Sequence, residues 1–364
     1  MKQKYDVAAY IWPSYSGNDP RTLTFWEEGY GEWQTVKKMQ PRFEGHQWPR
    51  KPLWGYVNEA DPYVMEMEIE AAAAHGVNVF IYDWYWFDNR PFLENCLNDG
   101  YLKARNNDKV KFYLMWANHN ANSMWDKRIS DQRVPIWNGA VDRKTFDFIV
   151  DRTIENYFKH PSYYKIDGKP VYMIFNPINF IEGLGGIEDA RRALAYFREK
   201  TVAAGFAGLE LQVCANGYLK RTLKDGTPAI DAINTLGFDS GSMYQYRDFV
   251  PMNDSYPNIL EAAKGHMERL TRELNCTLYP HVSVGWDSNP RYNIFHDDVC
   301  RDNTPENVQK AFEYAKNYVD THKELKAPLI TVNSWNEWTE TSYLQPDDLY
   351  GYGYLEAIKK VFTE

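Results

Sequence analysis

The sequence is poor in cysteine, and its few cysteines are widely separated. Its 364 residues include only 4 of them, namely Cys96, Cys214, Cys276 and Cys300. They form no Cys-x-x-Cys pair and no cluster with histidine, which are the patterns of zinc sites and of small disulfide frameworks. We therefore expect free cysteines, most of them packed in the interior, and no metal site.

The chain also lacks a net positive charge and long apolar runs. The formal net charge of −9 argues against a nucleic-acid partner, because a phosphate backbone requires a basic surface. No stretch approaches the roughly 18 apolar residues of a membrane-spanning helix. Residues 1–12 (MKQKYDVAAYIW) enter a strand-like run almost at once, without the features of a signal peptide. The expected location is cytoplasmic, or periplasmic or secreted if a signal peptide has been removed.

Phosphate-binding motifs and domain boundaries are absent as well. No Gly-x-Gly-x-x-Gly follows the first apolar run and no Walker-type loop occurs, so a nucleotide cofactor has no support and we expect no cofactor. No linker, low-complexity block or short repeat interrupts the chain. We therefore expect residues 1–364 to form one domain.

Aromatic residues, by contrast, are abundant. They make up 16% of the chain, with 13 tryptophans and 27 tyrosines. These side chains pack in cores, but they also stack on flat apolar faces while keeping a hydrogen-bonding edge. Sugar rings have such faces, so the composition favours an oligosaccharide or polysaccharide as the binding partner.

Short apolar runs alternate with amphipathic segments along the chain. We expect strands at 6–12, 77–86, 111–119, 169–176, 209–217, 238–246, 277–286 and 328–338. We expect helices at 61–76, 91–103, 143–158, 187–204, 258–274, 305–322 and 354–362. Strands that alternate with helices form a parallel sheet, and eight of them favour an α/β fold, the (β/α)₈ TIM barrel, with long loops at the C-terminal face of the strands.

The C-terminal ends of these strands are rich in polar and aromatic side chains, and active sites of such barrels lie at that face. The candidate substrate-binding residues are Trp12, Tyr82, Asp83, Trp84, Asn118, His119, Tyr244, Trp286, Asp287, Arg291, Trp335, Asn336 and Trp338, together with His46 from the long first loop. Several have a structural alternative. Asp83 can cap a loop, His119 can be a packed histidine, and Arg291 can either hold an anionic substituent or pair with an aspartate.

The most informative stretch is TVNSWNEWTETSYLQPD, residues 331–347. Glu337 and Glu340 lie three residues apart, so on a continuous strand they would point to opposite faces, and they converge only if the chain turns after Glu337. Two carboxyl groups are the usual acid and base of glycoside cleavage. In the structural alternative, residues 339–342 cap a short helix and Glu337 pairs with an arginine. The fourth strand lacks the acid that many retaining barrel enzymes carry, which leaves Asp83 and Asp287 as further partners.

Four segments together resemble one known family. They are residues 29–56, FIYDWYWF (80–87), LMWANHN (114–120) and SWNEWTETSYLQPD…YGYGYLEAI (334–358). They are similar to the WbsX-like group, which is related to glycoside hydrolase family 99. The likeness extends from the first strand to the last helix and is weakest at about 120–280.

This resemblance implies a (β/α)₈ barrel and an endo-acting, retaining α-mannosidase. It implies Glu337 as the base that deprotonates the 2-hydroxyl of the sugar and Glu340 as the acid, through a 1,2-anhydro sugar. The sequence departs from family 99 after Glu340, where Thr341 and Ser342 stand in place of a Gly-Thr pair. WbsX-like proteins are also labelled glycosyltransferases of polysaccharide assembly.

Three functions remain open from the sequence. The leading hypothesis is a glycoside hydrolase that acts on an α-linked, mannoside-like glycan. The second is a glycosyltransferase in polysaccharide assembly, although no nucleotide-sugar loop or DxD-type metal motif ends a strand. The third is a carbohydrate-binding barrel without catalysis, which would keep the aromatic residues but would not need both carboxylates.

Overall fold

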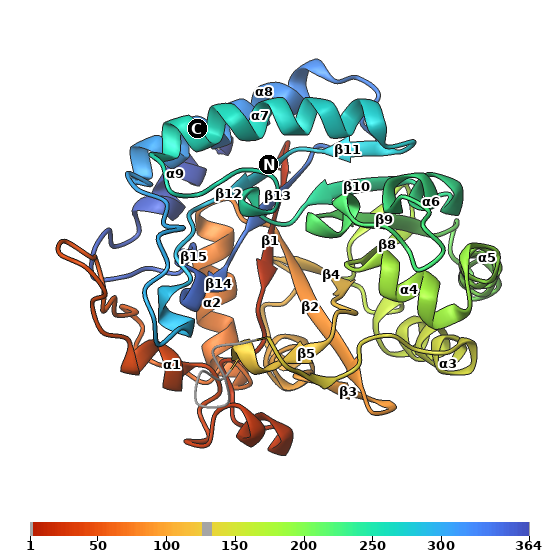
Figure 1. Ribbon diagram of the computed structural model, residues 1–364, viewed down its shortest axis with the longest axis horizontal. Helices are drawn as coiled ribbons and strands as arrows, with labels where there is room; N and C mark the ends of the chain where they lie inside the picture. Colours follow the sequence, from red (N-terminus) through yellow and green to blue (C-terminus); the bar gives the residue numbers. More distant parts are fainter. Residues whose placement is uncertain (1–2, 126–132, 364) are drawn as a thin grey trace.

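The computed structural model describes residues 3–125 and 133–363, and its centre is a parallel sheet (Figure 1). The order of neighbouring strands is β11-β10-β9-β8-β4-β2-β1-β13-β12. These strands are β1 Asp6–Ile11, β2 Val79–Phe87, β4 Lys111–Trp116, β8 Lys169–Ile174, β9 Glu210–Ala215, β10 Ser240–Met243, β11 Thr277–Tyr279, β12 His281–Ser283 and β13 Leu329–Asn333. They follow the eight predicted apolar runs.

The seventh predicted strand, 277–286, is divided in two by Pro280. Proline has no N–H for a sheet ladder, and it separates β11 from β12. β11 pairs with β10, whereas β12 pairs with β13, so the two halves join opposite ends of the strand order. The sheet thereby nearly closes, which confirms the predicted TIM barrel with one interrupted strand.

Helices surround the barrel (Figure 1). They are α1 Trp33–Lys38, α2 Pro62–Ala74, α3 Arg143–Thr153, α4 Pro177–Leu184, α5 Ile187–Ala203, α6 Ala229–Leu236, α7 Tyr256–Glu273, α8 Pro305–Thr321 and α9 Gly353–Phe362. The predicted helix 91–103 is wrong in its first half. Pro91 lies in β3, and only Cys96–Gly100 (η2) and Tyr101–Lys103 (η3) are helical, as a π turn and a 3-10 turn. Gly100 is a poor helix former and separates the two turns.

The remaining elements are short, and most belong to loops. The strands are β3 Arg90–Phe92, β5 Ala121–Asn122, β6 Pro135–Trp137, β7 Lys165–Ile166, β14 Asn336–Glu337 and β15 Ser342–Tyr343. The turns are η1 Pro20–Thr24, η4 Ser123–Trp125, η5 Ile154–Phe158, η6 Gly217–Lys220, η7 Tyr246–Asp248, η8 Asn289–Arg291 and η9 Trp338–Glu340. Several of these carry the polar residues that the sequence analysis placed at the ends of longer strands.

The barrel strands are buried on both faces, which explains their continuous apolar runs. Cys96, Cys214 and Cys300 are buried, Cys276 is half-buried, and all four are free, as predicted. Within residues 3–125 and 133–363, none of the helices combines the length and the apolar character that crossing a bilayer requires.

Candidate active site

The chain turns sharply after the last barrel strand, and this turn brings two glutamates together. β14 pairs with β15 as a hairpin, the turn η9 connects them, and Thr341 adopts a left-handed conformation with φ of 54°. Glu337 and Glu340 consequently face the same cavity. The predicted reversal of the chain after Glu337 is confirmed.

Polar side chains fix this turn against the first strand. The backbone N–H of Glu337 donates to Ser334 Oγ at 2.7 Å, and Ser334 Oγ donates to the carbonyl of Ser342 at 2.6 Å. The Asn336 amide pairs with the backbone of Trp12, accepting from its N–H at 2.8 Å and donating to its carbonyl at 2.9 Å. The glutamate backbone is therefore held in place by the fold.

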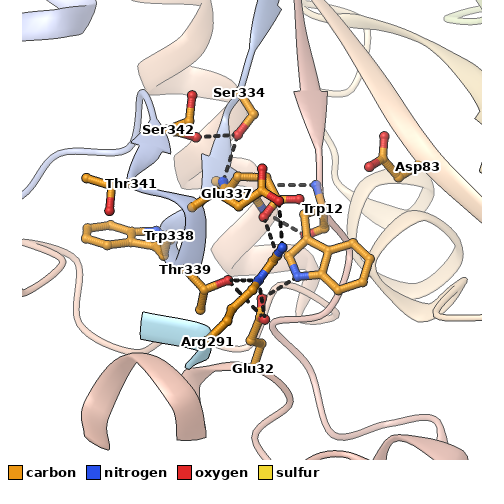
Figure 2. Close-up of polar contacts among 12 residues, drawn as sticks. Trp12, Glu32, Asp83, Arg291, Ser334, Glu337, Trp338, Thr339, Thr341 and Ser342 are labelled. Atoms are coloured by element: carbon orange, nitrogen blue, oxygen red, sulfur yellow. Dashed lines mark hydrogen bonds and ion pairs between the residues drawn. The ribbon is translucent and has the colours of Figure 1, made fainter. Parts of the chain in front are cut away.

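Arg291, from the turn η8, binds both glutamates. Its Nη2 donates to Glu337 Oε2 at 2.9 Å and its Nη1 to Glu340 Oε1 at 2.6 Å. Its Nε donates to Thr339 Oγ1 at 2.6 Å and lies 3.5 Å from Glu32 Oε1 (Figure 2). One guanidinium thus lies against three buried carboxyl groups. This position differs from both sequence interpretations of Arg291, which were an anion contact and a pair with an aspartate, whereas the alternative that Glu337 pairs with an arginine is confirmed.

The electrostatics of the group follow from burial and from these contacts. Burial and the neighbouring Glu340 raise the pKa of Glu337 well above its usual value, although Arg291 opposes the shift. Burial alone would lower the pKa of Arg291, but Glu340, Glu32 and Glu337 together raise it well above its ordinary value. The arginine stays charged, and Glu337 becomes a stronger base than an exposed glutamate.

Asp83 adds a further carboxyl group to the cavity lining, and it lies apart from the residues around Arg291 (Figure 2). The Tyr244 hydroxyl lies 3.2 Å from Asp83 Oδ2 and 3.4 Å from Glu337 Oε1. Burial raises the pKa of Asp83 well above its usual value. Asp83 Oδ1 and Glu340 Oε2 are buried and have no hydrogen-bond partner among the described residues. Buried polar atoms are normally paired, so these two oxygens are available to a ligand.

The cavity has a volume of about 420 Å³ and a mixed aromatic and polar lining. Its aromatic residues are Trp12, Tyr85, Trp125, Phe175, Tyr218, Tyr244 and Trp286. His119 is neutral there at neutral pH, because burial lowers its pKa to about 4. In residues 3–125 and 133–363, no three His, Cys, Asp or Glu side chains are grouped to hold a metal ion. Aromatic rings stack on the apolar faces of a sugar ring and carboxyl groups bind its hydroxyl groups, so this lining suits a sugar.

The structure divides the predicted site residues into two sets. Eight line the cavity, namely Trp12, Asp83, His119, Tyr244, Trp286, Arg291, Glu337 and Glu340. Tyr82 and Trp84 do not, because strand alternation sends them to the outer face of β2, where they contact Met65 and Glu94. The predicted placement of these two at the substrate is corrected.

Two further tryptophans also point away from the cavity. Trp335 was expected to share a face with Glu337, but the strand ends at Asn333 and its indole N–H donates to Glu68 Oε2 at 2.7 Å. Trp338 stacks on Tyr343 with ring centroids 3.9 Å apart. Alternation applies only to a continuous strand, and the turn interrupts it.

Four predicted residues hold loops together and do not line the cavity. Asn118 accepts from the backbone N–H of Asn176 at 2.7 Å, and Asn336 pairs with Trp12. His46 Nε2 lies 2.6 Å from Asp287 Oδ2, which ties the long first loop to the end of β12. These residues hold together loops around the site without lining its cavity.

Sequence reasoning missed several residues of the site. Tyr85 was detectable, because it lies two residues after Asp83 on one strand and so shares its face. Glu32 accepts from Trp12 Nε1 at 2.5 Å and from Thr339 Oγ1 at 3.0 Å. Its segment contributed to the family resemblance, but nothing local in the sequence marks it as a partner of Arg291.

Comparisons with known proteins bear on the family and the fold of this chain. The family model described as "Glycosyltransferase WbsX" matches residues 7–358. The uncharacterized protein WxcX of Xanthomonas campestris pv. campestris is 26% identical over 94% of this chain, in both strain B100 and strain ATCC 33913. The match covers 48% of WxcX, so the chain spans about half the length of the curated relatives that it matches.

Solved structures share the fold at low sequence identity. The GH99 endo-alpha-mannosidase from Bacteroides thetaiotaomicron is 16% identical with a TM-score of 0.56, over 97% of this chain and 95% of that one. A glycoside hydrolase-like protein is 15% identical with a TM-score of 0.63, over 99% and 94%. These likenesses establish the barrel architecture. The family model extends over nearly all of the sequence, and the chain belongs to the WbsX family.

Proposed function

We propose that this protein is a glycoside hydrolase that cleaves an α-linked, mannoside-like glycan with Glu337 and Glu340. The observation that carries the proposal is the pair itself, two buried carboxyl groups that share one guanidinium and face an aromatic-lined cavity. Glycoside cleavage requires an acid and a base on either side of one bond. The cavity offers both, and the unpaired Glu340 Oε2 is free to meet a glycosidic oxygen.

The two glutamates take different roles. Glu337, whose pKa is raised, accepts the proton of the 2-hydroxyl as that oxygen attacks the anomeric carbon. Glu340 donates a proton to the leaving oxygen as the glycosidic bond breaks, which gives a 1,2-anhydro sugar. Glu340 then accepts a proton from water, the water oxygen bonds to the anomeric carbon as the bond from that carbon to O2 breaks, and O2 recovers its proton from Glu337. The route requires a 2-hydroxyl trans to the leaving group, as in α-mannosides.

Two features support this assignment over a different placement of the acid. The fourth barrel strand, β8, ends without a carboxyl group at the cavity, since Phe175 and Asn176 follow it. One solved neighbour of the fold is an endo-alpha-mannosidase by name.

Glycosyl transfer is the second candidate, and the description of the family model favours it. The same acid and base serve transfer if a sugar hydroxyl replaces water in the second step. Hydrolysis and transfer therefore differ in the acceptor, which is water in one and a sugar hydroxyl in the other, and both use Glu337 and Glu340.

The test compares the wild type with Glu337→Gln and Glu340→Gln on α-mannosidic glycans, with Glu188→Gln on the exposed face of α5 as control. We expect each cavity variant to lose at least about a thousandfold in kcat while glycan binding is retained. Released sugar identifies hydrolysis, and elongated product identifies transfer. Unchanged turnover in either cavity variant removes that glutamate from the mechanism, and binding without turnover by the wild type leaves a carbohydrate-binding barrel.

A further inference from the structure

The charges of the cavity lining differ between its buried and its exposed residues. The buried carboxyl groups are Glu337, Glu340 and Asp83, and Arg291 binds the first two. The outer wall holds three other arginines, Arg133 before β6, Arg221 after η6 and Arg247 on η7, and all three are exposed. Among the described residues Asp248 is the one carboxyl group of that wall. The outer wall therefore has a surplus of positive charge, although the whole chain carries −9.

These arginines are only weakly engaged by the protein. Arg247 Nη2 lies 3.6 Å from Asp298 Oδ2, with side chains 41% and 37% exposed, and such surface pairs contribute little. Within residues 3–125 and 133–363, neither Arg133 nor Arg221 forms an ion pair with a carboxylate. Three guanidinium groups thus line the cavity, and among the described residues they have few hydrogen-bond acceptors.

Aromatic rings position two of them. The Arg247 guanidinium carbon lies 4.4 Å from the centroid of the Trp286 ring, and that of Arg221 lies 4.7 Å from the Tyr218 ring. Contact with a ring restricts an arginine but leaves its N–H groups free to bind a planar or tetrahedral anion. Trp286 Nε1 is also buried without a partner among the described residues, so it is a further donor beside Arg247.

We propose that the outer wall of the cavity is a subsite for an anionic substituent, so that the substrate is an acidic glycan that carries carboxylate, sulfate or phosphate groups. This inference rests on the proposed function, because it specifies the substrate class of the same cavity. The charged group lies on a sugar other than the one whose bond lies at Glu337 and Glu340, since the three arginines are exposed whereas the two glutamates are buried. A positive wall in a concave site concentrates the field on such a ligand.

A nucleoside-diphosphate sugar carries anionic groups too, but the wall fits it less well. Its diphosphate is usually held by backbone N–H groups of a glycine-rich turn at a helix start. The cavity arginines instead come from three separate segments of the chain. They suit charges that are distributed along a glycan.

The test measures binding in the Glu340→Gln background, which holds glycan without turnover. The probes are a neutral α-mannan oligosaccharide, the same oligosaccharide with a carboxylate, sulfate or phosphate at C6, and GDP-mannose. The variant is Arg221→Ala with Arg247→Ala, and the control is Arg191→Ala with Arg192→Ala. The control removes the same charge from exposed arginines of α5 that do not line the cavity.

We expect at least one charged glycan to bind about tenfold or more tightly than the neutral one, with an affinity that falls as salt is added. Arg221→Ala with Arg247→Ala should reduce the affinity for the charged glycan on the order of tenfold for each arginine, and the affinity for the neutral glycan should not change. The control pair should keep the preference. Whichever of the three charged groups binds most tightly identifies the natural substituent.

Equal affinity for neutral and charged glycans, no binding of any glycan, or a preference that survives in the cavity variant would overturn the proposal. Tighter binding of GDP-mannose than of every charged glycan would overturn it in favour of a nucleotide-sugar donor. Sugar release by the wild-type protein is measured separately. A charge preference without release retains the subsite and rejects hydrolysis, whereas release without a charge preference does the reverse.

Discussion

Two groups of buried glutamates lie on either side of the turn that follows β13, and they differ in their partners. Glu337 and Glu340 face the cavity and share Arg291. Glu59 and Glu68 lie behind the turn, outside the cavity lining, and no cation of the described residues pairs with them. Asn336 donates to Glu59 at 2.9 Å, and Trp335 donates to Glu68 at 2.7 Å.

Burial raises the pKa of carboxyl groups in both places, to about 7 for Glu68 and well above the usual value for Glu59 and Glu337. A perturbed pKa therefore does not by itself locate an active site. Access to the cavity and a shared cation distinguish Glu337 and Glu340, the front pair, from Glu59 and Glu68, the rear pair. The rear pair accepts from neutral donors that fix the turn, which is a structural task.

Removal of the cation should have the largest effect of the changes that probe this difference. In Arg291→Ala the pKa of Glu337 rises further, because Arg291 opposes its upward shift. We expect kcat/KM to fall about a hundredfold or more and the acidic limb of its pH profile, which requires ionised Glu337, to move to higher pH. Stability should fall by about 3 kcal/mol, since a buried ion group loses its partner.

Kinetics across pH and urea unfolding measure these effects. Arg143→Ala, which breaks an exposed ion pair with Asp147, is the control and should change neither. An unchanged pH profile in Arg291→Ala would show that this guanidinium does not set the charge of Glu337.

The rear pair should affect stability without affecting turnover. The pKa of Glu68 is about 7 in the folded state, against 4.5 for the free residue. Between these pH values the folded state therefore holds a proton on Glu68 that the unfolded state has lost. The stability that this protonation provides is complete below about pH 4.5 and is lost as pH rises through 7. Glu68→Gln keeps an acceptor for Trp335 Nε1 and removes this loss.

We therefore expect Glu68→Gln to match the wild type at pH 4 and to be up to about 3 kcal/mol more stable at pH 8. Urea unfolding at both pH values measures the difference, and kcat should be unchanged. A variant that is less stable at pH 8, or that loses turnover, would contradict the division between the two pairs.

Glu32 should have the smallest effect, because it acts on the front pair through its charge and through Arg291. Glu32 raises the pKa of Glu337, so Glu32→Gln should move the acidic limb of the pH profile to lower pH by a fraction of a unit. The glutamine keeps an acceptor for Trp12 Nε1. Glu28→Gln, in the same loop but paired with Lys38 at the surface, is the control and should leave the limb in place.

Much of this arrangement was predictable from the sequence where the information is local. The apolar runs located the barrel strands, and the order of strands and helices predicted the closed sheet. The spacing of Glu337 and Glu340, with polar residues after them, predicted the turn that brings them together. Strand alternation also explains why Asp83 reaches the cavity and Tyr82 does not, although both had been placed there.

Contacts between distant segments were not predictable in this way. Nothing near Arg291 in the sequence indicates that it binds Glu337, Glu340 and Glu32, which come from two other places in the chain. Nor does the sequence near Arg221 and Arg247 show that they face one cavity wall.

The sequence by itself determined the strands, the helices and the turn at Glu337, because these depend on the conformational preferences and the polarity of neighbouring residues. Only the tertiary structure decided which carboxyl groups are charged partners, which are structural, and where the positive wall lies. Those properties depend on burial and on distances of a few ångströms between side chains from separate loops. Closure of the barrel sets these distances.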